Sequence, residues 1–81
     1  MNEETALAQL SNASRMLAEI TTVQGAKSHL EWLKAFEVLA KAAGLSLEQQ
    51  NVIAENRLRT ERLAGRMLRE GPKNEGTAGR L

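Results

Sequence analysis

The feature that most constrains this chain is a helix stop followed at once by a helix start, at residues 44–49. Gly44 is suited to the left-handed conformation that ends a helix. The residues Ser46-Leu47-Glu48-Gln49 form a capping box, in which Ser46 caps the new helix and Gln49 bonds back to it. Because so few residues separate the stop from the start, we predict that the two helices fold back on each other as an antiparallel hairpin.

Apolar side chains recur at spacings of three and four residues in three segments, at about residues 4–20, 23–43 and 47–70. This is the period of an α-helix, and no segment shows the sustained alternation of a strand. Thr22 is the expected N-cap of the second helix, and Gly71-Pro72 ends the third. We therefore predict an all-α protein, with a long antiparallel hairpin and a shorter N-terminal helix laid against it.

Composition indicates a small core. The chain has 81 residues with one Trp, one Phe and no Tyr, and domains of this size bury a small share of their surface. We expect one helical domain at residues 1–70, whose under-buried helices are bundled in a homodimer. The segment 71–81 contains three Gly and one Pro and no apolar stripe, so we predict a disordered tail there.

Several classes of function are excluded by what the sequence lacks. Without Cys there are no disulfides, no thiolate nucleophiles and no Cys-based metal sites. His29 is the single histidine and cannot form a two-histidine metal site. No phosphate loop, nucleophile arrangement or other catalytic motif is present. We expect no enzyme activity, no cofactor, no metal and no small-molecule substrate. The acidic N-terminus and the short apolar runs favour a cytoplasmic protein without a membrane span.

Four arginines of the third helix share one stripe of about 80°, at 100° per residue. They are Arg59, Arg62, Arg66 and Arg69. One interpretation is a surface for phosphate or an acidic partner, because guanidinium groups bind anions in a bidentate way. The other is a solvated helix face, in which Glu55 pairs with Arg59 and Glu70 with Arg66 one turn away.

The opposite side of this helix is largely apolar and holds a charged pair in its middle. Its apolar and small residues are Ile53, Ala54, Leu58, Ala64, Gly65, Met67 and Leu68. Arg57 and Glu61 lie one turn apart within them and could satisfy each other, which would set the register of a hairpin or oligomer interface. Alternatively, the helix is rotated or their long side chains reach water. Gly65 suggests a close helix approach or, alternatively, a mild kink.

Two aromatic residues of the second helix are interpreted structurally. Trp32 is expected to be a packing anchor or an interface residue rather than a ligand platform. His29 is expected to be a hydrogen-bonded structural residue, with Glu37 two turns further along.

A pattern of residues between Thr22 and Glu70 resembles a helical module of phage, prophage and actinobacterial proteins. The matching residues are Thr22-Val23, Ala26-Lys27, Gly44-Leu45-Ser46-Leu47-Glu48-Gln49-Gln50-Asn51, Ala54-Glu55, Arg57, Arg59, Glu61-Arg62 and Gly65. The resemblance implies that Arg57, Glu61 and Gly65 form one packing unit. Longer members continue into a partition-protein-like region, whose role in DNA transactions we do not expect here. This chain has Asn56 where an aliphatic residue is common, and Arg66 where an acidic one is common.

These observations predict a non-catalytic interaction protein of a phage or mobile element, which docks a helix face on a protein partner, such as a host protein. Trp32, Leu58 and Met67 would be its apolar anchors. The alternative is a small nucleic-acid-associated protein whose arginine stripe touches phosphates.

Overall fold

The computed structural model describes residues 1–70, and the tail predicted at 71–81 lies outside the described residues. The described part consists of three helices and contains no strand: α1 (Glu3–Ala18), α2 (Val23–Ala42) and α3 (Leu47–Glu70). The predicted all-α class is therefore confirmed. The first helix ends two residues earlier than expected, because the chain already turns at Glu19 and Ile20.

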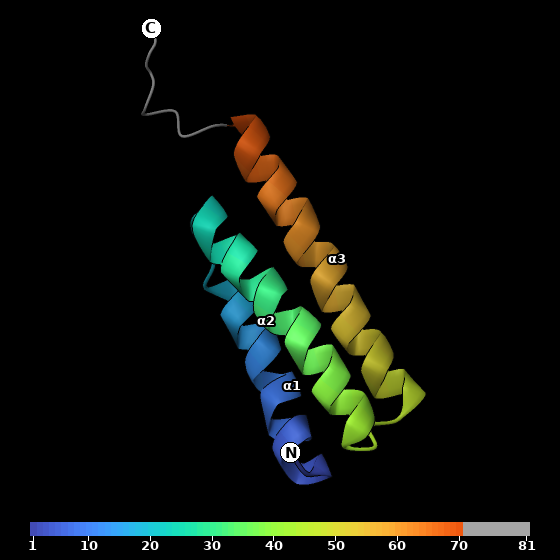
Figure 1. The fold of residues 1–81 in the computed structure, drawn as a ribbon. Coiled ribbons are helices and arrows are strands. Elements are labelled where there is room, and N and C mark those ends of the chain that lie inside the picture. Colours follow the sequence, from blue (N-terminus) through green and yellow to red (C-terminus); the bar gives the residue numbers. More distant parts are fainter. Residues whose placement is uncertain (71–81) are drawn as a thin grey trace, which may run out of the picture.

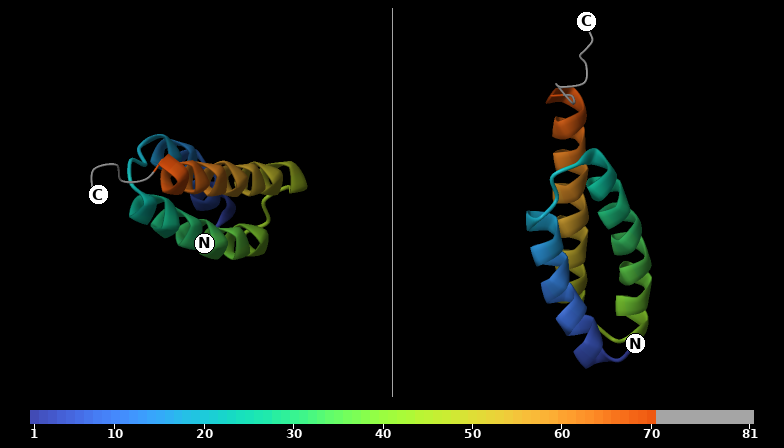
Figure 2. Two further views of the ribbon diagram at one scale, coloured as in Figure 1. Left: turned by 90° about the horizontal axis from the view of Figure 1, so that it is seen from above. Right: turned by 90° about the vertical axis from the view of Figure 1, so that its left-hand side faces the viewer.

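The three helices form a rod of 52 × 17 × 17 Å. Each helix contacts the other two, and the largest contact is between α2 and α3. These two run in opposite directions, and the C-terminal end of α3 extends past α2 (Figure 1). Figure 1 shows α1 and α2 both to the left of α3, and the right-hand view of Figure 2 shows α3 behind and between them, which leaves the far side of α3 without a neighbouring helix.

Side-chain caps define where the helices begin. Thr22 Oγ1 accepts a hydrogen bond from the Gly25 backbone N–H at 2.9 Å. The capping box also forms, since Ser46 N–H donates to Gln49 Oε1 at 2.8 Å and Gln49 N–H donates to Ser46 Oγ at 3.1 Å. Gly44 has a φ of 89°, the left-handed conformation that its position after α2 predicts.

The core is small because α1 contributes alanines to it. Ala6 and Ala13 are fully buried and let α1 approach the other helices closely. Leu33 and Phe36 of α2 and Ile53 of α3 fill the centre. Many leucines consequently stay at the surface, and those on α3 define the surface described next.

Candidate interaction surface

The buried side of α3 is partly polar. Ile53, Asn56 and Thr60 are at most 5% exposed and face α1 and α2. Leu58, one of the expected apolar anchors, is 46% exposed, so the helix is rotated relative to its apolar side, which is the alternative left open by the sequence. Two of the three most buried positions carry polar side chains, and an apolar pattern could not locate them.

A buried hydrogen bond joins α2 to α3. His29 is 3% exposed, and its Nε2 lies 3.0 Å from Asn56 Oδ1. With the amide oxygen as acceptor, Nε2 is the nitrogen that carries the proton. The hydroxyl of Thr60 donates a hydrogen bond to the backbone carbonyl oxygen of Asn56 at 2.7 Å. Such a polar contact inside an apolar core favours one alignment of the two helices. His29 is thus a hydrogen-bonded structural residue, with Asn56 and not Glu37 as its partner.

Trp32 packs within the fold. Its ring stacks between those of His29 and Phe36, with centroid distances of 5.8 Å and 5.1 Å. The side chain is half-buried against the core. These contacts favour a packing anchor over an exposed docking residue. Met67, the third expected anchor, is also half-buried.

Arg57 pairs across the helices rather than along its own. Its Nη1 lies 3.0 Å from Glu37 Oε1 of α2, and the two side chains are 33% and 27% exposed. Of the two alternatives for Arg57 and Glu61, mutual pairing is therefore not observed, and Glu61 is exposed. Four residues advance a helix by about 40° beyond a full turn, which rotates Glu61 away from α2.

The exposed side of α3 carries a second row of residues at alternating spacings of four and three. We call it the outer face, and its members are Leu47, Asn51, Ala54, Leu58, Glu61, Gly65 and Leu68. At 100° per residue it lies roughly 140° from the buried side. Leu47, Leu58 and Leu68 are 74%, 46% and 62% exposed. Part of this row was predicted as the apolar side of the helix, but Leu47 and Asn51 were not. The unbroken heptad spacing from Leu47 to Leu68 is the sequence feature that would have identified them.

Gly65 lies in this row with open space above it. Apart from its chain neighbours and the nearby backbone of its own helix, no atom lies within 4 Å of the place where a Cβ would stand. The close helix approach predicted at Gly65 is therefore absent within residues 1–70, because Gly65 lies on the side of α3 that faces away from α1 and α2. A shallow depression of about 550 Å³ surrounds it. It is lined by Leu58, Glu61, Arg62, Gly65, Arg66 and Arg69.

The arginine stripe runs beside the outer face, and all four of its members are exposed. Arg59 pairs with Glu55 at 2.9 Å, as expected. The expected ion pair between Arg66 and Glu70 is not formed. Among residues 1–70, Arg62, Arg66 and Arg69 have no acidic side chain within 4.0 Å. From Leu58 to its C-terminal end, α3 thus combines two exposed leucines with three arginines that form no ion pair within residues 1–70.

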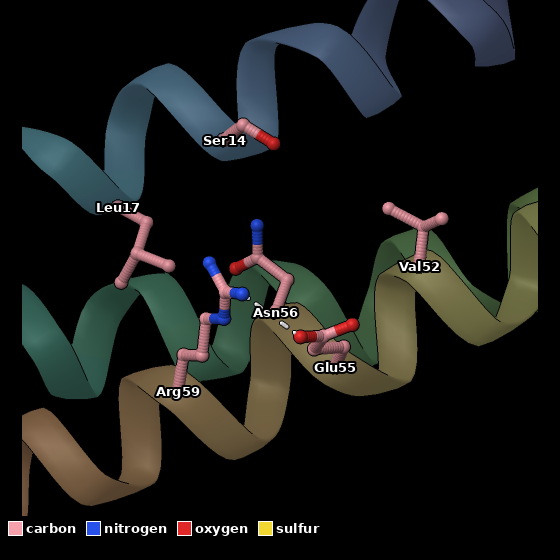
Figure 3. Close-up of a pocket in the computed structure, with 6 residues that line it drawn as sticks. All are labelled: Ser14, Leu17, Val52, Glu55, Asn56 and Arg59. Atoms are coloured by element: carbon pink, nitrogen blue, oxygen red, sulfur yellow. Dashed lines mark hydrogen bonds and ion pairs between the residues drawn. The ribbon is translucent and has the colours of Figure 1, made fainter.

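A pocket of about 240 Å³ with a mixed polar and apolar lining lies between α1 and α3 (Figure 3). Ser14 and Leu17 line it from α1, and Val52, Glu55, Asn56 and Arg59 from α3. Pockets that hold small ligands usually enclose about 300–1,000 Å³. Its lining contains one carboxylate and no histidine, so it supplies no acid–base pair.

Neither a metal site nor a membrane helix is found in the part of the chain that the structure describes. No three His, Cys, Asp or Glu side chains of residues 1–70 come together to hold a metal ion. None of the helices there is long and apolar enough to span a bilayer. Comparisons with family models, curated proteins and solved structures find no match to this chain.

The outer face and the neighbouring arginine stripe together form the candidate interaction surface of residues 1–70.

Proposed function

We propose that this protein is a non-catalytic helical interaction module that docks the outer face of α3 on a helix of a partner protein. The observation that carries the proposal is the exposure of Leu58 and Leu68 on either side of Gly65, which has open space above it. A glycine inside a helix costs about 1 kcal/mol relative to alanine. Close contact with another helix offsets that cost, because the missing side chain lets two backbones approach.

The chemistry of this surface indicates the kind of partner. Burying a leucine side chain contributes roughly 1.5–3 kcal/mol, so Leu58 and Leu68 favour an apolar stripe opposite them. Arg62, Arg66 and Arg69 favour carboxylates beside that stripe, since charge-assisted bonds orient the docked partner. The partner surface is therefore an amphipathic helix with an acidic flank.

Further observations support the other parts of the proposal. The small core and the exposed leucines support helix pairing between copies, with the antiparallel α2–α3 hairpins bundled as a coiled-coil-like homodimer. The resemblance of residues 22–70 to the phage and actinobacterial module supports a mobile-element origin. The lack of Cys supports a location in the host cytoplasm.

A single charge placed on the outer face tests the proposal. Leu58→Glu puts a carboxylate at its centre, and Val38→Glu is the matched control on α2, where Val38 is 68% exposed. Tagged variants are incubated with a nuclease-treated extract of cells that carry the gene. We expect proteins that bind the original chain and V38E to be lost from L58E. Equal retention by all three would refute docking through this face.

The second candidate function is nucleic-acid binding, which Arg62, Arg66 and Arg69 favour because they form no ion pair within residues 1–70. If the arginine stripe contacts four phosphates, a plot of the logarithm of the binding constant against the logarithm of the salt concentration has a slope of about −3.6. Fluorescence anisotropy of a labelled duplex measures that slope. Docking through leucines predicts no such binding to DNA.

A further inference from the structure

We infer that the occupant of the outer face is a second copy of this chain, with the two α3 helices antiparallel and a two-fold axis beside Leu58. This inference rests on the proposed function, because it names the partner of the same face. The antiparallel arrangement is inferred from two sets of residues on α3, each of which is arranged about the same point of the helix, near Leu58.

The first set is a row of charges along one flank of the outer face. Its members recur every seven residues and are all exposed: Glu48, Glu55, Arg62 and Arg69. The sign of the charge reverses halfway along the row. An antiparallel pair centred near Leu58 therefore sets Glu48 against the partner's Arg69 and Glu55 against the partner's Arg62. A parallel pair in register would place the two copies of this row on opposite sides of the interface, where their charges could not pair with each other.

The second set is the outer face itself. Its apolar ends, Leu47 and Leu68, lie nearly equal distances along the helix from Leu58. The axis that matches the charges also sets Leu47 against the partner's Leu68 and Leu58 against the partner's Leu58. The same pairing places Asn51 opposite the partner's Gly65, where there is open space for its side chain. Glu61 meets the small side chain of the partner's Ala54.

The N-terminal half of α3 is thus the amphipathic helix with an acidic flank that the C-terminal half requires. Leu47 and Ala54 supply the apolar stripe, and Glu48 and Glu55 supply the carboxylates. The interface is isologous, because each copy contributes both halves, and it closes at two chains. Asn51 and Glu61 interrupt the apolar row and oppose other registers.

Cysteine cross-linking tests the orientation, since the chain has no Cys of its own. A disulfide requires Cα atoms within about 7 Å. Under mild oxidation we expect Leu58→Cys to form covalent dimers by itself. Leu47→Cys is expected to stay unlinked alone, because the two copies of this position would lie about 31 Å apart along the axis. A mixture of L47C with Leu68→Cys is expected to link. Val38→Cys on α2 is the control for random collision. Linked L47C alone would overturn the antiparallel arrangement.

Charge reversal tests the complementarity. Glu48→Arg with Glu55→Arg makes the flank wholly basic, and Arg62→Glu with Arg69→Glu makes it wholly acidic. In sedimentation equilibrium we expect each double variant to weaken the dimer roughly tenfold or more, since four exposed pairs change sign. Mixing the two variants is expected to restore association. The variant with all four reversals, which keeps the complementarity, is expected to pair like the original chain. All these positions are exposed, and circular dichroism checks that the helices persist.

The outcomes separate this inference from the proposed function. A chain that stays monomeric at every concentration, while L58E still loses a captured protein, overturns the second-copy inference and leaves docking in place. A chain that dimerises equally well with L58E overturns the inference, because its dimer then uses another face. If L58E changes neither association nor capture, both the inference and the proposed function fail.

Discussion

Replacing Asn56 by leucine tests whether the buried polar contact specifies the packing of α2 on α3. Asn56 Oδ1 is the hydrogen-bond partner of His29 Nε2 at 3.0 Å, and His29 Nδ1 already has none. In Asn56→Leu the buried imidazole keeps no partner on either nitrogen. Leaving one more buried group unsatisfied costs about 1–3 kcal/mol. For a domain of this size, each kcal/mol lowers the unfolding midpoint by about 4–8 °C.

A double-mutant cycle shows whether the loss comes from the orphaned imidazole. His29→Leu combined with Asn56→Leu replaces both partners by apolar groups, and we expect its free energy of unfolding to return to that of the original chain or exceed it. Urea unfolding followed by far-UV circular dichroism measures all four proteins at one fixed concentration. The reasoning is refuted if N56L alone is as stable as the original chain, or if the two single losses simply add.

Further substitutions test other parts of the fold. Gly44→Ala is expected to cost about 1–2 kcal/mol, because φ at Gly44 is 89°, whereas Gly65→Ala is expected to stabilise the monomer by about 1 kcal/mol. Thermal unfolding at high dilution compares the two, and equal signs would contradict the geometry. Ile53→Ala is expected to cost about 2–5 kcal/mol in urea unfolding, because Ile53 is fully buried; a loss below about 1 kcal/mol would contradict its place in the core. Glu37→Gln is expected to cost at most about 1 kcal/mol, since its pair with Arg57 is partly exposed. Added salt should shrink that loss, and a salt-independent loss would exclude the ion pair as its cause.

Local signals in the sequence predicted the helices well. Thr22 and the Ser46 capping box act within four residues of chain, so their effect is independent of how the helices pack. Gly44 likewise ends α2 through its own backbone conformation. The all-α class followed from apolar spacing, which is also a local property.

Rotation of α3 was harder to predict, because it depends on partners distant in sequence. Apolar patterning placed Leu58 on the apolar side of the helix and gave no weight to Asn56 and Thr60, yet Asn56 and Thr60 are buried and Leu58 is exposed. Asn56 is acceptable inside only because His29, 27 residues earlier, supplies a donor. Arg57 likewise forms its ion pair with Glu37 of α2 and not with a residue of its own helix. Such pairings require the packed structure.

The central claim is that α3 pairs through its outer face with a second copy of the chain, while its opposite side holds the fold together. A dilution series of amide NMR spectra on the unaltered chain tests it most directly. We expect the signals of Leu47, Ala54, Leu58, Gly65 and Leu68 to shift with protein concentration, while those of the buried side of α3 stay fixed. Shifts confined to α1 or α2, with the outer face unchanged from the lowest to the highest concentration, would contradict it.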